Sequence, residues 1–189
     1  AALRVIPQLI VIRPADANET TVAWRIALTQ RHRPVALVLT RQNLPIFDRA
    51  QMAAADGLAR GAYILLDTEG AMPDIILIAS GSEVSLAVEA RQQLAQQGIR
   101  ARVVSMPSWE LFEQQPQTYR AAVLPPAVRK RLAIEAGVPQ GWRDYVGPQG
   151  DIIGLTRFGA SAPGAVVMDK LGFNAPHIVA RALKLLAGT

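Results

Sequence analysis

Arg41 is the residue whose side chain and position most favour chemistry with a ligand. It follows the apolar run VALVLT (35–40) and opens the polar turn RQN. A guanidinium group is planar, permanently charged and able to give paired hydrogen bonds to a phosphate or a carboxylate. Ligands of open parallel sheets bind beyond the carboxyl ends of the strands, so this position predicts an anion site and favours a phosphate. Spacing alone leaves a second interpretation open, in which Arg41 pairs with a carboxylate at a domain edge.

Other polar positions are weaker candidates. The run SGS at 80–82 lies between an apolar strand and a helix, where backbone N–H groups can hold an anion, although a helix cap explains the same residues. Glu135 ends an apolar strand and is a candidate general acid or base, but a buried salt bridge or a backbone contact is the favoured interpretation. His32 and His177 have no second histidine or carboxylate at metal-ligand spacing, so we expect both at the surface.

Several classes of site and partner are excluded by composition. The sequence has no GxGxxG, no GK[ST] phosphate loop, no GxSxG and no paired-histidine zinc motif. Without cysteine it has no thiolate site and no disulfide, which fits a reducing compartment, and we expect the cytoplasm. The 20 Lys and Arg residues exceed the 15 Asp and Glu residues but are scattered, which argues against nucleic acid. No apolar run approaches the roughly 18 residues that cross a bilayer, so we expect no membrane contact.

Apolar periodicity places Arg41 at the end of a strand–helix–strand unit. The strands are 9–12 and 35–39, and the helix between them begins at Asp16, which with Glu19 has the spacing of a capping box. A crossover of this kind builds a parallel sheet, which we expect to be covered on both faces.

A second strand–helix–strand unit follows a connector at 47–61. Its strands are 74–79 and 99–105, and its helix runs from about residue 83 to a left-handed stop at Gly98. The sequence therefore predicts an α/β protein with two sheets. The remaining predicted elements are an edge strand at 61–67, strands at 131–136 and 150–155, short helices at 108–115 and 117–123, a helical turn at 142–146, and closing helices at 163–171 and from Asn174 onward.

A set of longer motifs identifies a family. By these motifs the chain resembles the C-terminal part of a transketolase over nearly its whole length. The motifs are, in order, IRPADANE, LVLTRQNLP, ASGSEVSLAVEA, RARVVSMPSWELF, YRAAVLPPAV, EAG and RFGASAP. The resemblance implies the end of a pyrimidine-binding domain at 1–48, a linker at 49–60 and a C-terminal domain at 61–189, whose mixed sheet is flanked by helices.

The resemblance also implies an activity. Transketolases of the pentose phosphate pathway are homodimers that use thiamine diphosphate and a divalent cation, Mg or Ca, to move a two-carbon ketol unit between sugar phosphates. The arginine of their [ST]RQNLP motif binds the substrate phosphate, and Arg41 matches it. Its neighbours Thr40, Gln42 and Asn43 receive no separate role.

The family's motifs for the diphosphate, the metal and the activating glutamate are missing from this sequence, which starts without Met as if cut at its N-terminus. No catalytic, cofactor-binding or metal-binding residue is therefore carried over. We expect the isolated chain to bind no cofactor and to be inactive, and we expect strands 9–12 and 35–39 to expose apolar surface.

Three alternatives remain open at this point. Two are the matching portions of related thiamine enzymes, a deoxyxylulose phosphate synthase or the β-type subunit of an oxo-acid dehydrogenase. The unbroken RQNLP and VVSMPSWELF stretches argue against both. The third is a non-catalytic module that keeps a transketolase C-terminal-like domain for assembly or regulation.

Overall fold

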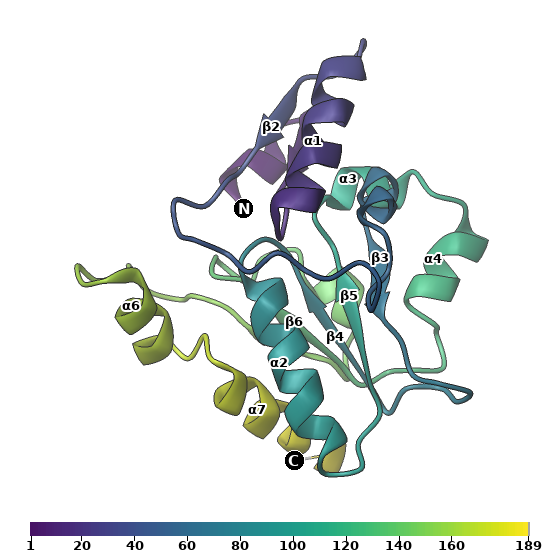
Figure 1. Ribbon diagram of the computed structural model, residues 1–189, viewed down its shortest axis with the longest axis vertical. Coiled ribbons are helices and arrows are strands. Elements are labelled where there is room, and N and C mark those ends of the chain that lie inside the picture. Colours follow the sequence, from purple (N-terminus) through teal and green to yellow (C-terminus); the bar gives the residue numbers. More distant parts are fainter. Residues whose placement is uncertain (189) are drawn as a thin grey trace.

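Two β-sheets organise the chain in the computed structural model, which describes residues 1–188 (Figure 1). The first is a parallel pair, β1 (Ile10–Ile12) and β2 (Val35–Leu37), joined through helix α1 (Ala17–Thr29). The second has the strand order β3-β5-β4-β6-β7, in which β3 is antiparallel to β5 and the other neighbours are parallel. The predicted α/β class with two sheets, the second of mixed direction, is confirmed. The second-sheet strands are β3 (Tyr63–Leu66), β4 (Ile75–Ala79), β5 (Ala101–Ser105), β6 (Arg131–Ile134) and β7 (Asp151–Ile153).

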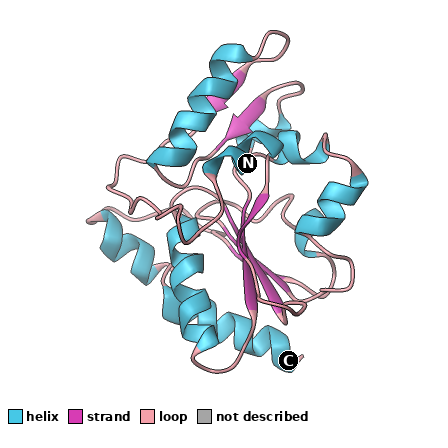
Figure 2. Ribbon diagram, turned by 45° about the vertical axis from the view of Figure 1, so that its right-hand side comes forward, coloured by secondary structure: helices cyan, strands magenta, loops and turns pink. Residues whose placement is uncertain are grey.

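The five-stranded sheet lies between two layers of helices (Figure 2). Helices α2 (Glu83–Ala95) and α7 (Ala175–Ala187) cover one face, and α3 (Trp109–Glu113), α4 (Gln117–Val123) and α5 (Arg143–Val146) cover the other. Alternate residues of β4 face the two cores: Ile75 and Leu77 pack toward α2, and Ile76 and Ile78 toward α5. Each such buried side chain contributes about 1.5–3 kcal/mol, so the central strand is a rigid base for the residues at its end.

The first sheet is covered mainly by α1 and by η2 (Ala55–Arg60). Ile10 and Ile12 are fully buried among side chains that include Val22 of α1 and Leu58 of η2. The expectation that 9–12 would expose apolar surface is therefore wrong, because α1, η2 and α3 cover it. It is correct beyond β2, where Leu39 is 49% exposed. A second 3-10 helix, η1 (Ala2–Val5), precedes β1.

The helix starts follow the predicted caps in two of three cases. The Asp16 side chain accepts a 2.8 Å hydrogen bond from the Glu19 N–H, while the Glu19 carboxylate reaches back to Ala15 N. Asn174 caps α7 by accepting from His177 N–H at 2.8 Å. The capping box expected at 80–83 is not formed. The Ser80 hydroxyl bonds Arg13 and Glu135, and Ser82 makes no side-chain capping bond, since its hydroxyl contacts the Glu83 carboxylate.

Two further features matter for the site. The segment that follows β2 passes between the first sheet and α2, and α6 (Gly164–Lys170) stands out from the body of the molecule (Figure 1). Within residues 1–188, no helix has the length and apolarity needed to cross a membrane.

Candidate functional site

Arg41 lies just beyond the edge where the two strands of the first sheet end. Because β1 and β2 are parallel, both carboxyl ends reach this edge. The backbone pairing continues one step further, where Val38 N–H donates to Ile12 O at 2.9 Å. A turn follows in which Gln42 N–H donates to the Thr40 hydroxyl at 3.1 Å. Strand pairing and this turn together hold Arg41 at the predicted position.

The Arg41 side chain is exposed, and no residue in 1–188 gives it a hydrogen bond or an ion pair. The interpretation in which it pairs with a carboxylate is therefore wrong for the described chain. An arginine at a strand end has five N–H donors available for a planar oxyanion. Its role as an anion site stays a prediction.

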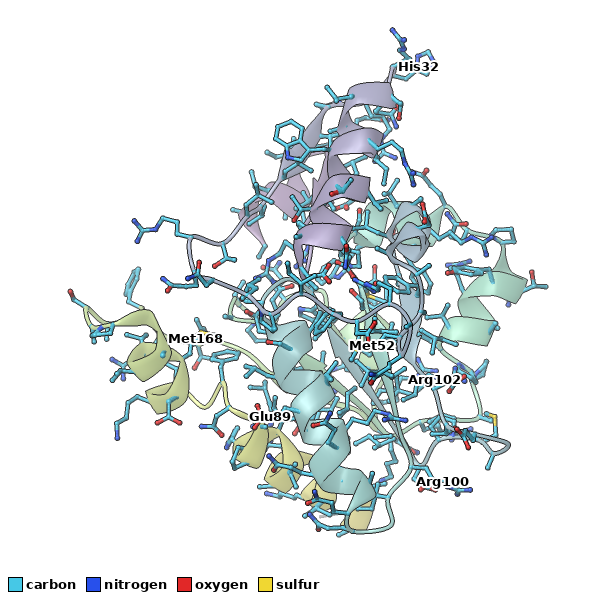
Figure 3. The ribbon with its side chains drawn as sticks, viewed as in Figure 1. His32, Met52, Glu89, Arg100, Arg102 and Met168 are labelled. Carbon is cyan, nitrogen blue, oxygen red and sulfur yellow. The ribbon has the colours of Figure 1, made fainter. Side chains whose placement is uncertain are left out.

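A cleft of about 820 Å³ opens beside this turn. One wall consists of residues 38–44, and the opposite walls are the first two turns of α2, helix α6 and the start of α7. Glu89 of α2 and Met168 of α6 line it, and both are labelled in Figure 3. Arg13 and Arg41 both contribute to the lining. The Arg41 turn thus faces a hollow bounded by the second sheet's helices.

The other sequence candidates, Ser80 and Glu135, meet in a buried ionic cluster. The Ser80 hydroxyl accepts a 2.8 Å hydrogen bond from Arg13 and donates one of 2.9 Å to Glu135. Arg4 forms two 2.8 Å hydrogen bonds to the same carboxylate. The salt-bridge interpretation of Glu135 is confirmed. The Ser80 hydroxyl is bonded to Arg13 and Glu135. The run 80–82, a candidate anion site from the sequence, therefore contacts a cation, Arg13, instead.

The electrostatics of this cluster favour the charged forms of Glu135 and Arg13. Burial alone would raise the pKa of Glu135, but the hydrogen bonds and charge of Arg4 and the charge of Arg13 outweigh it and hold the pKa below its usual value. Burial alone would lower the pKa of Arg13, and Glu83 and Glu135 reverse that direction. A general acid or base needs a pKa near the working pH, so Glu135 is poorly suited to proton transfer.

The two histidines lie apart from any metal-binding arrangement. His32 is exposed at the tip of the α1–β2 turn, at the far end of the first sheet (Figure 3). His177 lies in the first turn of α7 and is partly exposed, in agreement with the surface position expected for it. Across residues 1–188, no group of three or more His, Cys, Asp or Glu side chains could hold a metal ion.

Sequence reasoning missed Arg4 and Arg13. Both lie in the first segment, residues 1–48, whereas their carboxylate partners lie in the second segment, residues 61–188. The only signal in the sequence was that Arg13 directly follows the buried strand β1, as Arg41 follows β2. That pattern marks a strand end but does not reveal which distant carboxylate will face it.

Comparison with known proteins gives consistent matches along the chain. Residues 1–46 match the family model described as the transketolase pyrimidine binding domain, and residues 61–174 match the transketolase-like C-terminal domain. A transketolase of Geobacillus stearothermophilus is 52% identical over 98% of this chain. The chain spans 28% of that relative's length.

Solved structures agree with these matches. A Pichia stipitis transketolase in complex with sedoheptulose 7-phosphate has a TM-score of 0.90 and 39% identity, covering 98% of this chain and 26% of that one. A split-gene transketolase described as an inactive β4 tetramer has a TM-score of 0.77 over 98% of this chain and 60% of its own. Its identity of 22% makes it a likeness of fold alone.

Proposed function

The chain belongs to the transketolase family, and from that premise we propose that it is part of an enzyme that moves a two-carbon ketol unit between ketose and aldose phosphates. In this proposal residues 1–48 end the pyrimidine-binding domain, 49–60 are a linker and 61–189 form the C-terminal domain. The proposal is supported by roughly half-identical relatives that match nearly the whole chain. The complete enzyme is proposed to be a cytoplasmic homodimer.

Within that enzyme we assign Arg41 to the phosphate of the sugar substrate. The observation that supports this role is an exposed guanidinium group without any partner in residues 1–188, at the carboxyl end of a parallel strand pair and beside a cleft. Paired N–H donors match the oxygens of a phosphate group. Arg41 would bind and orient the substrate, and would take no part in bond making.

In this proposal the residues of this chain do not hold thiamine diphosphate or a divalent cation, the cofactors of the reaction. Residues 1–188 hold no acidic or histidine cluster suited to a metal ion, and the sequence has no glycine-rich phosphate loop. We therefore assign no step of the reaction to this chain beyond substrate binding. Alone, the chain is proposed to be inactive.

The second candidate function is a non-catalytic assembly or regulatory module. It is favoured by exposed apolar side chains on α1, where Trp24 and Leu28 lie one turn apart and are 51% and 75% exposed. Such side chains commonly mark contact surfaces. If the activity of the complete enzyme with phosphorylated substrates depends on Arg41, this non-catalytic function is excluded for the full protein.

The test is Arg41→Ala in the complete enzyme. Loss of the charged hydrogen bonds, worth about 1.5–3 kcal/mol in total, should lower kcat/KM for ribose 5-phosphate by about 10- to 150-fold. The loss for glycolaldehyde, which has no phosphate, should be much smaller. Arg31→Ala is the matched control, since Arg31 is also exposed but lies at the opposite end of the first sheet beside His32. Equal losses for both acceptors would contradict the assignment.

A further inference from the structure

The five-stranded sheet contains a crevice of the kind that usually receives a ligand. Neighbouring strands β4 and β6 are parallel, yet the helices that follow them, α2 and α5, pack on opposite faces. Loops diverge at such a point, and open α/β sheets bind ligands there. Ser80 follows β4 and Glu135 follows β6 at this position.

The crevice is occupied by Arg13 of the first segment. Its guanidinium group lies 3.1 Å from the carboxylates of Glu83 and Glu135. Its backbone is held as well, because Arg13 N–H donates to Pro107 O at 2.9 Å and Arg13 O accepts from Gly81 N–H at 3.0 Å. Arg13 therefore contacts the second segment through both its main chain and its side chain.

Arg4 also contacts the residues of this crevice. Its guanidinium carbon stacks 3.8 Å from the ring centre of Trp109 while its nitrogens pair with Glu135. Two arginine side chains, 7% and 17% exposed, thus meet two carboxylates that are 0% and 4% exposed. The two positive and two negative charges cancel, so the crevice has no excess positive charge to attract an anionic ligand.

We propose that this crevice is a docking socket for Arg13 and that Arg13 is a positioning residue for Arg41. The connection is short: Arg13 directly follows β1, and Ile12 at the end of β1 accepts the hydrogen bond of Val38 on the strand that leads into the Arg41 turn. Fixing Arg13 on the rigid sheet fixes the edge from which Arg41 projects. The positioning role rests on the proposed function, whereas the docking does not.

The docking is tested by distance measurements on the chain itself. Because the sequence has no cysteine, Asn43→Cys and Gln92→Cys allow nitroxide labels to be placed near Arg41 and on α2 without background labelling. Pulsed electron paramagnetic resonance should give one narrow distance distribution. Glu135→Gln should broaden this distance distribution. Ser80→Ala should broaden it less, because it removes only the hydrogen bonds of a neutral hydroxyl and leaves every charge paired.

The control for this measurement is Arg100→Gln, which breaks an exposed ion pair with Asp74 inside the second segment. It should leave the distribution narrow. Distributions that are as narrow in Glu135→Gln and Ser80→Ala as in the parent chain would overturn the docking. Ser80→Ala keeps the test decisive if Glu135→Gln does not fold.

The positioning role is tested in the complete enzyme by the ratio of kcat/KM for ribose 5-phosphate to that for glycolaldehyde. Arg13→Gln should lower this ratio about tenfold, mainly through KM for the phosphorylated acceptor, as expected for two coupled residues. In an Arg41→Ala background the same change should lower it no further, because Arg13 acts through Arg41.

The outcomes separate the two proposals. An equal effect of Arg13→Gln with and without Arg41, or no effect on the ratio at all, would overturn the positioning role even if Arg41→Ala behaves as expected. If Arg41→Ala itself leaves the ratio unchanged, the phosphate assignment fails and the positioning role fails with it. The label distances would still decide whether Arg13 docks.

Discussion

The hydroxyl group of Tyr63 donates a 2.7 Å hydrogen bond to Oε1 of Glu19, whose side chain is fully buried. Ser105 donates to the same oxygen at 2.7 Å. These contacts join β3 and β5 of the second sheet to the start of α1. They form a second connection between the two segments, separate from the cluster around Arg13. A buried carboxylate is tolerated there because its oxygens receive several donors.

Tyr63→Phe should destabilise the chain. It removes one donor from the buried Glu19 carboxylate, which should cost about 1–3 kcal/mol of the free energy of unfolding measured in urea. Tyr119→Phe is the matched control, because Tyr119 donates to the neutral carbonyl of Ala62 and is only partly buried. We expect the control variant to lose about 0.5–1.5 kcal/mol of the free energy of unfolding. Equal losses in the two variants would show that Glu19 has no special dependence on Tyr63.

Glu135 should make the chain more stable at neutral than at acid pH. Its pKa in the folded state lies below the usual value, so its contribution is present above the ordinary glutamate pKa and is lost as pH falls through the folded value. Glu135→Gln should therefore cost on the order of 3–5 kcal/mol near pH 7, as for a broken buried pair, and progressively less below about pH 4. Urea unfolding between pH 3 and pH 8 checks this. If the difference in free energy of unfolding between the parent chain and Glu135→Gln does not vary with pH, the prediction is wrong.

Glu19 should show the opposite sign. Burial raises the pKa of Glu19 despite the hydrogen bonds from Ser105 and Tyr63 that oppose it. Its contribution to stability is then fully present below the ordinary glutamate pKa and declines as pH rises through the raised value. Relative to the parent chain, Glu19→Gln should become less destabilising as pH rises, in the same urea experiment. The two glutamates thus serve as controls for each other.

Gly81 should tolerate alanine less well than Gly70. Both have a positive φ, +61° and +65°, so a side chain should cost each about 1–2 kcal/mol. A Cβ atom at Gly81 would also lie 3.3 Å from the guanidinium of Arg13, whereas at Gly70 it would meet open space. We expect Gly81→Ala to lower the free energy of unfolding by about 1 kcal/mol more than Gly70→Ala does, which is comparable to one weakened hydrogen bond. Identical unfolding curves for the two variants would mean that the contact with Arg13 is not tight.

Local structure could be predicted from the sequence because local rules determine it. The helix from Ala17 begins at its Asp16 cap, and α2 is followed by a left-handed Gly98 as expected from its sequence. Strand ends were predicted to within two residues, since the expected strands 35–39 and 131–136 end at Leu37 and Ile134; Arg41 and Glu135 both lie shortly beyond these ends. Apolar periodicity therefore sufficed to predict the fold class and the candidate strand ends.

Long-range pairing could not be predicted in the same way. The sequence identified β3 as an edge strand but did not predict that it pairs with β5. It favoured a salt bridge for Glu135 without naming Arg4 or Arg13, because the choice among 20 Lys and Arg residues depends on how the two segments pack. Strand 9–12 was expected to be exposed for the same reason, since its cover comes from η2 and α3 as well as α1.

The isolated chain should neither bind thiamine diphosphate nor transfer ketol units. Positioning and charge stabilisation of the reacting groups require several side chains held together, and residues 1–188 offer Arg41 but no cluster for the metal. Calorimetric titration with thiamine diphosphate and magnesium should show no saturable heat, and a coupled assay with xylulose 5-phosphate and ribose 5-phosphate should show no turnover. The complete enzyme with Arg41→Ala is the positive control, because it should still bind the cofactor while losing efficiency toward phosphorylated acceptors. Saturable binding or turnover by the isolated chain would mean that its 189 residues contain a cofactor site not recognised from these side chains.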